Sequence, residues 1–231
     1  MSGNDTVSTY GDSSTPGRTA AWIWLGFTGV LTLIAFGLPS PEEDAEPLVY
    51  SYEFTANAIF IDAVFVIAAV VIAYFYTSRD WQDTFGFRRF TGRHLGLAAG
   101  VAIASLVVGA VVEIFLNAGD RQGIAADTWD SSRLTPFIIN AAIIIGLGPF
   151  VEELLFRGVG VRVLSVFGAP AAIAMSGVMF GLIHGIWEAL PALIVFGVGL
   201  AYVRPRTNSV FPAFLAHAAF NAVGLAASFA G

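Results

Sequence analysis

The sequence predicts an all-α fold, a polytopic membrane helix bundle of about seven transmembrane helices. Two observations support this class. Hydrophobic residues make up 56% of the 231-residue chain and charged residues only 12%, whereas roughly 25% of a soluble domain is charged. The apolar residues also gather in long runs, and a spanning helix needs about 20 of them.

Seven apolar runs follow one another along the chain. They cover residues 19–38, 54–76, 95–112, 134–151, 163–187, 189–203 and 209–230. The run 189–203 is short for a span. The fourth run is expected to continue as a helix to about Ser165, because the Gly and Pro residues of 167–170 predict a turn there.

The rest of the chain is assigned by composition. Residues 1–19 are rich in Ser, Thr, Gly and Asp and predict a disordered tail, without the features of a signal peptide. Residues 20–230 predict a single integral membrane domain. The chain has no cysteine, which excludes a disulfide framework and a cysteine protease.

Arginine predicts the orientation, since all eleven basic residues are Arg. One set of loops holds Arg18, Arg79, Arg88, Arg89, Arg93, Arg204 and Arg206. The opposite loops hold Arg121 and Arg133 with Glu42, Glu43, Asp44 and Glu46. Positive residues favour the cytoplasmic side, so the N-terminus is expected in the cytoplasm, with the chain in the plasma membrane of a prokaryote. No nucleic acid partner is expected, and the oligomeric state stays open.

The segment 150–157, Phe-Val-Glu-Glu-Leu-Leu-Phe-Arg, places three charges in an apolar run. Each charge within a membrane costs at least ~2.5–3.5 kcal/mol, so such residues are usually functional. Glu153 and Arg157 are spaced i, i+4, which predicts an ion pair along the helix. Glu152 is free to face another helix and is the candidate general base.

Spacing brings further polar residues to the same depth. Glu152 and His184 each lie sixteen residues from Gly168, about 24 Å from the turn in an antiparallel hairpin. Phe180 precedes His184 by one turn and is expected to pack under its ring. His217 and Asn221 are spaced i, i+4 and share a helix face.

Each polar residue also has a simpler interpretation. Alone, His184, Asn221 and Asn140 are expected to be interhelical hydrogen-bonding residues, worth ~0.6 kcal/mol on average. Asp62 and Glu113 are expected to be packing or interfacial residues. Small residues predict close helix approach at Gly146, Gly148, Gly177, Gly181, Gly197 and Gly199. The shared depth of the Glu and His residues favours a site.

Three ordered motifs resemble those of the CPBP family, the CAAX proteases and bacteriocin-processing enzymes also called Abi. They are Glu152-Glu153-Leu-Leu-Phe-Arg157, Phe180-Gly-Leu-Ile-His184 and His217-Ala-Ala-Phe-Asn221. The resemblance covers about residues 134–230, which become the expected catalytic core. Residues 20–117 carry no motif and are the expected variable helices 1–3.

The resemblance implies a CAAX prenyl protease-like intramembrane endopeptidase. Glu152 would activate water with assistance from His184, and His217 and Asn221 would bind water and stabilise the oxyanion. Glu153, Arg157 and Phe180 would support them. The implied partners are the bilayer and a membrane-embedded or lipidated peptide. Eukaryotic members cleave prenylated CAAX proteins, and prokaryotic ones are linked to bacteriocin maturation or self-immunity.

Metal dependence has two interpretations. The family carries the label metalloprotease, and Glu152, His184 and His217 can form a zinc site with an open position for water. However, the sequence lacks His-Glu-x-x-His, and Asn221 is a poor zinc ligand. A mechanism without metal or other cofactor is preferred, with zinc as the alternative.

Two other classes of function remain. Buried Glu and His can serve a proton-coupled transporter, but no inverted repeat of the kind found in transporters is evident. The chain can also be a non-catalytic membrane immunity or scaffold protein that retains the fold without turnover.

Overall fold

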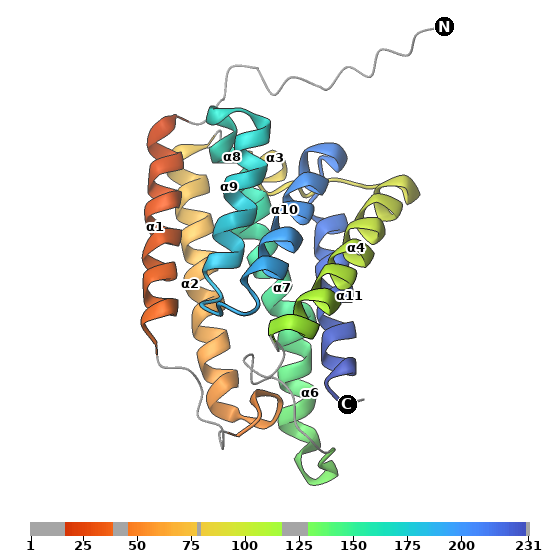
Figure 1. The fold of residues 1–231 in the computed structure, drawn as a ribbon. Coiled ribbons are helices and arrows are strands. Elements are labelled where there is room, and N and C mark those ends of the chain that lie inside the picture. Colours follow the sequence, from red (N-terminus) through yellow and green to blue (C-terminus); the bar gives the residue numbers. More distant parts are fainter. Residues whose placement is uncertain (1–16, 39–45, 78–79, 117–128, 230–231) are drawn as a thin grey trace, which may run out of the picture.

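A bundle of helices forms the part of the chain that the computed structural model describes, residues 17–38, 46–77, 80–116 and 129–229 (Figure 1). The helices are α1 (Arg18–Gly37), α2 (Tyr52–Tyr76), α3 (Trp81–Phe85), α4 (Gly92–Leu116), α6 (Leu134–Ala142), α7 (Gly148–Glu153), α8 (Val161–Leu164), α9 (Ala169–Leu182), α10 (Leu190–Thr207) and α11 (Phe211–Ala227). Short 3-10 turns cover Leu48–Tyr50, Ser131–Arg133 and Ser165–Phe167. The described residues contain no strand, so the all-α prediction is confirmed.

Two π-helical segments join α6, α7 and α8 into one helical run. They are η3 (Ile143–Leu147) and η4 (Leu154–Gly160). Helices α1, α2, α4 and the run Ser131–Phe167 are long and apolar enough to cross a membrane, and α9 and α11 are shorter apolar helices. The chain is therefore a polytopic helical membrane protein. That all seven predicted runs cross the bilayer stays a prediction.

The turn predicted at residues 167–170 is confirmed, because the preceding run ends at Phe167 and α9 begins at Ala169. The end of the next apolar run, predicted at residue 187, is wrong as a helix end. Helix α9 ends at Leu182, so His184 lies in the turn that follows. Gly185 has a φ of 69°, a left-handed conformation that commonly ends helices. A Cβ there would lie 2.7 Å from the carbonyl oxygen of Ala35, so the close approach of α1 also requires glycine.

Close packing of α9 and α10 depends on small residues, as predicted for part of the glycine set. A Cβ at Gly177 would lie 2.4 Å from the backbone nitrogen of Val198, and one at Gly197 would lie 2.5 Å from the carbonyl oxygen of Gly177. Gly146 has no atom within 4 Å of such a position, so its predicted role is wrong. The second motif lies beside the first because α9 also contacts η4.

Helix α2 lies against α7 and η4. Its buried residues form an inward stripe that consists of Asp62, Phe65, Ala69, Ile72 and Ala73. Near its start, Thr55 donates a hydrogen bond to Asn140 of α6 over 2.5 Å, and the Asn140 amide donates to the carbonyl oxygens of Leu48, Val49 and Ser51. Asn140 is thus the interhelical hydrogen-bonding residue that the sequence predicts.

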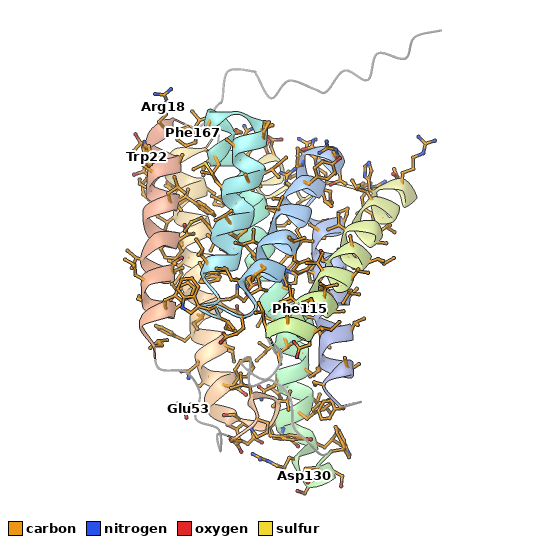
Figure 2. The ribbon with its side chains drawn as sticks, in the orientation of Figure 1. Arg18, Trp22, Glu53, Phe115, Asp130 and Phe167 are labelled. Carbon is orange, nitrogen blue, oxygen red and sulfur yellow. The ribbon has the colours of Figure 1, made fainter. Side chains whose placement is uncertain are left out.

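The two ends of the bundle carry different ion pairs. Figure 2 shows Arg18 and Phe167 at one end and Glu53 and Asp130 at the other. At the second end Arg133 pairs with Glu46. Several predicted residues lie outside the described ones, namely 1–16 of the tail with Arg79, Arg121, Glu42, Glu43 and Asp44. The sidedness and the division into domains stay predictions.

At the first end, four residues form what we call the α3 cluster: Asp83, Arg88, Arg162 and Arg204. The Asp83 carboxylate lies 3.2 Å from Arg88 and 3.3 Å from Arg162. Arg204 donates to the backbone carbonyl oxygen of Asp83 over 3.1 Å. The cluster ties α3 to α8 and to the end of α10, so two predicted Arg-rich loops do lie together.

Candidate active site

The backbone around the paired glutamates departs from regular α-helix, because η3 precedes and η4 follows α7. The amide of Gly148 donates to the carbonyl of Ile143, and Pro149 has no N–H to donate. The carbonyl of Ile144 therefore lacks both of its usual helical donors. Asn221 supplies one instead, with its amide nitrogen 2.8 Å from that oxygen.

The carbonyls of η4 are also bound by side chains from other helices. Trp24 of α1 donates through its indole N–H to the carbonyl of Leu155 over 3.0 Å, and Ser176 of α9 donates to that of Phe156 over 3.0 Å. Such partners are needed where a membrane helix departs from α geometry. π-Segments are common at functional sites, and these two flank the charged motif.

Glu153 and Arg157 form the ion pair that their spacing predicts. The Arg157 Nη1 lies 2.9 Å from Glu153 Oε1, and both side chains are fully buried. The other guanidinium nitrogen, Nη2, donates to the carbonyl of Gly197 over 3.0 Å. The guanidinium also lies 4.3 Å from the centre of the Phe180 ring. Arg157 thus connects the first motif to α9 and α10.

His217 lies between the two glutamates. Its Nδ1 donates to Glu153 Oε1 over 3.0 Å, and its Nε2 is 3.6 Å from Glu152 Oε2. The second separation is too long for a hydrogen bond. The side chain of Glu152 is 21% exposed, whereas that of Glu153 is 0% exposed. Of the two carboxylates, only that of Glu152 is partly exposed. Together we call Glu152, Glu153, Arg157 and His217 the buried cluster.

The ring of Phe180 joins the three motifs. It lies 4.9 Å from the ring of His184 and 5.5 Å from that of His217, between ring centres. The ring is fully buried and also contacts Arg157. The sequence predicts the first of these contacts. The other two arise because α9 and α11 pack around the same point.

His184 follows the end of α9 and is half-buried. Its Nδ1 lies 2.7 Å from the carbonyl oxygen of Phe180. A carbonyl only accepts, so Nδ1 carries the proton of this bond. In the neutral ring, Nε2 is then left with a free lone pair. His184 makes no hydrogen bond to Glu152 or His217 in the described part of the chain.

The structure thus brings the predicted residues together to different degrees. Glu152 and His217 are in direct contact, His184 joins them through Phe180, and Asn221 is bound to the backbone of η3. Sequence analysis missed the bond between His217 and Glu153. The signal was present in the i, i+4 pair, since a carboxylate oxygen has two lone pairs and can accept from a second donor. Here Oε1 of Glu153 accepts from both Arg157 and His217.

The predicted zinc ligands do not form a ready metal site. Within the described ranges, no three His, Asp or Glu side chains lie together as a group able to hold a metal ion. His217 uses Nδ1 for Glu153, and His184 uses Nδ1 for a carbonyl, so both rings keep Nε2 for another partner. Metal dependence therefore stays a prediction.

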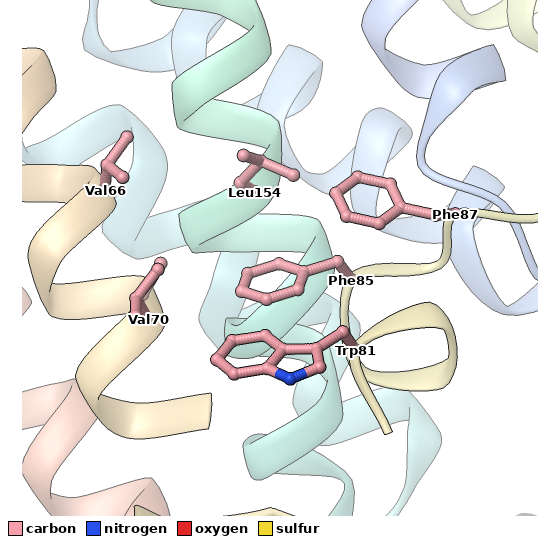
Figure 3. A pocket seen from close by; sticks show the side chains of 7 residues that line it. Val66, Val70, Trp81, Phe85, Phe87 and Leu154 are labelled. Atoms are coloured by element: carbon pink, nitrogen blue, oxygen red, sulfur yellow. The ribbon is translucent and has the colours of Figure 1, made fainter. Parts of the chain in front are cut away.

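An apolar groove of about 320 Å³ adjoins the site. Figure 3 shows its wall formed by α2, by the aromatic residues of α3 and by Leu154. The lining residues are Val66, Ala69, Val70, Trp81, Phe85, Phe87 and Leu154. Leu154 directly follows the paired glutamates, so the groove lies beside the segment that carries them.

Comparison with known proteins gives one family. The family model described as "Type II CAAX prenyl endopeptidase Rce1-like" matches residues 134–223. The resemblance to the CPBP family is confirmed. The CPBP match covers the run from α6 to most of α11 and includes all three motifs. It supports a membrane endopeptidase of the CAAX protease type in general. No curated protein and no solved structure matches the chain.

Proposed function

We propose that the protein is an intramembrane endopeptidase that hydrolyses a peptide bond with a water activated by Glu152. The observation that carries this proposal is the contact of Glu152 with His217, 3.6 Å apart. Two groups at that separation can both lie within hydrogen-bonding distance of one water beside them. Glu152 is also the exposed member of the carboxylate pair.

The chemistry follows from these positions. The water oxygen attacks the carbonyl carbon of the substrate while its proton passes to Glu152. The same proton then goes to the leaving amine as the C–N bond breaks. The bond from His217 to Glu153 fixes the imidazole ring, and Arg157 compensates the charge of Glu153. Glu153 and Arg157 thus hold His217 against Glu152.

His184 and Asn221 complete the proposed site. The free Nε2 of His184 assists by accepting a hydrogen bond from water or substrate. The Asn221 amide has two N–H groups, of which one bonds to Ile144. The second is the proposed donor to the oxyanion, where a fixed donor has its largest effect.

The proposed substrate is a membrane-embedded or lipidated peptide. The groove beside Leu154 is lined only by apolar side chains, which suits an apolar segment next to the scissile bond. No cofactor is proposed, because the described residues contain no group of three His, Asp or Glu side chains able to hold a metal ion. The proposed location is a prokaryotic plasma membrane, with the N-terminus in the cytoplasm.

The test uses purified wild type and Glu152→Ala with a library of apolar and lipidated peptides in detergent or lipid. Wild type is expected to cleave members of the library, and Glu152→Ala is expected to cleave none. Arms with and without a chelator test metal dependence together with activity. Equal cleavage by both proteins contradicts the proposal. Binding without cleavage by folded wild type favours the immunity or scaffold alternative.

A further inference from the structure

Asp62 is an inward-facing acid on a helix outside the family match. It is 8% exposed, whereas its neighbours Phe60 and Ile61 are 69% and 48% exposed. It shares the inward stripe of α2 with Phe65 and Ala69. The packing of α2 against α7 and η4 turns this face toward the run that carries the glutamates. Asp62 is therefore neither at the membrane surface nor toward lipid.

The carboxyl of Asp62 has no protein partner in the described part of the chain. Its Oδ2 is buried without a hydrogen bond, and no Arg or His pairs with the group. A buried polar group without a partner costs about 1–3 kcal/mol, and more when charged. An apolar residue at position 62 would stabilise the packing of α2 more than Asp62 does. The stability of the fold therefore does not explain why an acid is present here.

Two contacts fix the level of Asp62 on the neighbouring run. Thr55 bonds to Asn140, and Ala69 and Leu154 line the same groove. Asp62 is midway between Thr55 and Ala69, so it is level with about residue 147. Glu152 is five residues further, roughly 7.5 Å along the axis, and its side chain leans back toward that level.

We infer that Asp62 is a positioning residue of the hydrolytic site, which holds the carboxylate of Glu152 through one bridging water. The inference rests on the proposed function. One oxygen of that carboxylate, Oε2, faces His217. A water between Asp62 and the other oxygen donates one O–H to each acid and fixes the Glu152 carboxylate beside the attacking water. Asp62 thus brings a helix without any family motif into the reaction.

The test compares Asp62→Asn, Asp62→Leu and Glu53→Gln, an exposed acid at the start of the same helix. We expect kcat to fall at least about tenfold in Asp62→Leu, because misplacement of a reacting group has costs of this order. Asp62→Asn keeps an acceptor oxygen and should retain more activity. KM should stay within about twofold in both, since the substrate contacts are unchanged. Glu53→Gln should match wild type.

Thermal unfolding separates a positioning role from a structural one. Asp62→Leu should unfold at the same or a higher temperature than wild type, because it removes an unpartnered carboxyl from an apolar interior. A large fall in its Tm overturns the inference, whether or not a cleaved peptide is known. Full kcat in Asp62→Leu, with Glu152→Gln inactive, overturns the inference alone. Full turnover in Glu152→Gln overturns the proposed function itself.

Discussion

The buried cluster and the α3 cluster both contain ion pairs between a carboxylate and arginine, but the surroundings of these pairs differ. In the buried cluster, Glu153 and Arg157 are 0% exposed and bond over 2.9 Å. In the α3 cluster, the Asp83 side chain is 26% exposed and lies 3.2–3.3 Å from two arginines. One cluster lies within the bundle beside the candidate base, and the other lies where helices leave the bundle.

The surroundings decide how much each cluster contributes to the free energy of unfolding. Charges near solvent attract weakly, and exposed ion pairs stabilise by about 0–1 kcal/mol. Charges in the interior attract strongly, but their desolvation offsets the gain. The partly exposed members of the α3 cluster, Asp83 and Arg88, can therefore be altered with smaller effects, whereas Arg162 and Arg204 of that cluster are buried. The buried cluster contributes little net stability when intact, yet loss of one member leaves another charge stranded.

The largest effect is expected from Glu152→Gln. The variant keeps the shape of the side chain and removes the base, so turnover should fall by about 10²–10⁴-fold. Folding should be retained, because Glu152 has no partner within hydrogen-bonding distance among the described side chains. Cleavage rate and thermal unfolding measured on the same sample check this prediction. An active Glu152→Gln beside a folded but inactive Glu153→Gln would reverse the two assignments.

Glu153→Gln should mainly reduce stability. It removes the negative charge between Arg157 and His217 and leaves the guanidinium unpaired in the interior. Loss of one partner of a buried pair costs about 3–5 kcal/mol. Expression level and the midpoint of denaturation measure the effect. A variant as stable as wild type shows that Arg157 finds another partner.

Asn221→Ala should have an intermediate effect. It leaves the Ile144 carbonyl without a donor, which costs about 1–3 kcal/mol for a buried polar group. Activity should fall as well if the second amide N–H serves the oxyanion. Asn57→Ala, an exposed Asn of α2, is the matched control for both measurements. Unchanged stability in Asn221→Ala would show that water replaces the amide.

A small effect is expected from Asp83→Asn in the α3 cluster. The free energy of unfolding should fall by about 1 kcal/mol or less. The difference from wild type should shrink at high salt, since partly exposed pairs are screened. Denaturation of both proteins at low and high salt gives the comparison. A loss as large as that of Glu153→Gln would show that the two clusters do not differ as argued.

The smallest effect is expected from chelation. We expect the purified active protein to contain well under one zinc per chain and to keep most activity with a chelator. Added zinc should inhibit by binding near His184 and His217. Elemental analysis and activity assays check both. Stoichiometric zinc, with activity lost on chelation and restored by metal, contradicts the preference for a mechanism without metal.

Regular spacing predicted much of the fold and part of the site. The apolar runs placed the helices, and i, i+4 spacing placed Glu153 beside Arg157. Spacing assigned Glu153 to Arg157 and only Glu152 to another helix, but Glu153 also contacts α11 through His217. An imidazole has two nitrogens on different edges, and each faces one carboxylate. Such pairings depend on how α11 packs, which the sequence pattern does not encode.

Local backbone geometry limited how much of the rest of the site could be predicted from the sequence. The end of α9 before His184 depends on Gly185 and on the approach of α1, a contact between distant parts of the chain. The π-segments break the 3.6-residue period on which the level of each residue was estimated. Asp62 appeared isolated in the sequence because nothing along α2 marks the run that packs against it.

The carbonyl of Ile144 also bears on how the protein is made. Helix α11 is synthesised after the run that contains Pro149. The carbonyl oxygen of Ile144 therefore lacks the Asn221 donor until α11 has been inserted. The same late helix brings His217 to the glutamates. A nascent chain that has not yet inserted α11 thus has an unpaired carbonyl oxygen that favours binding of this helix. The proposed hydrolytic site is incomplete until α11 has packed against η3 and α7.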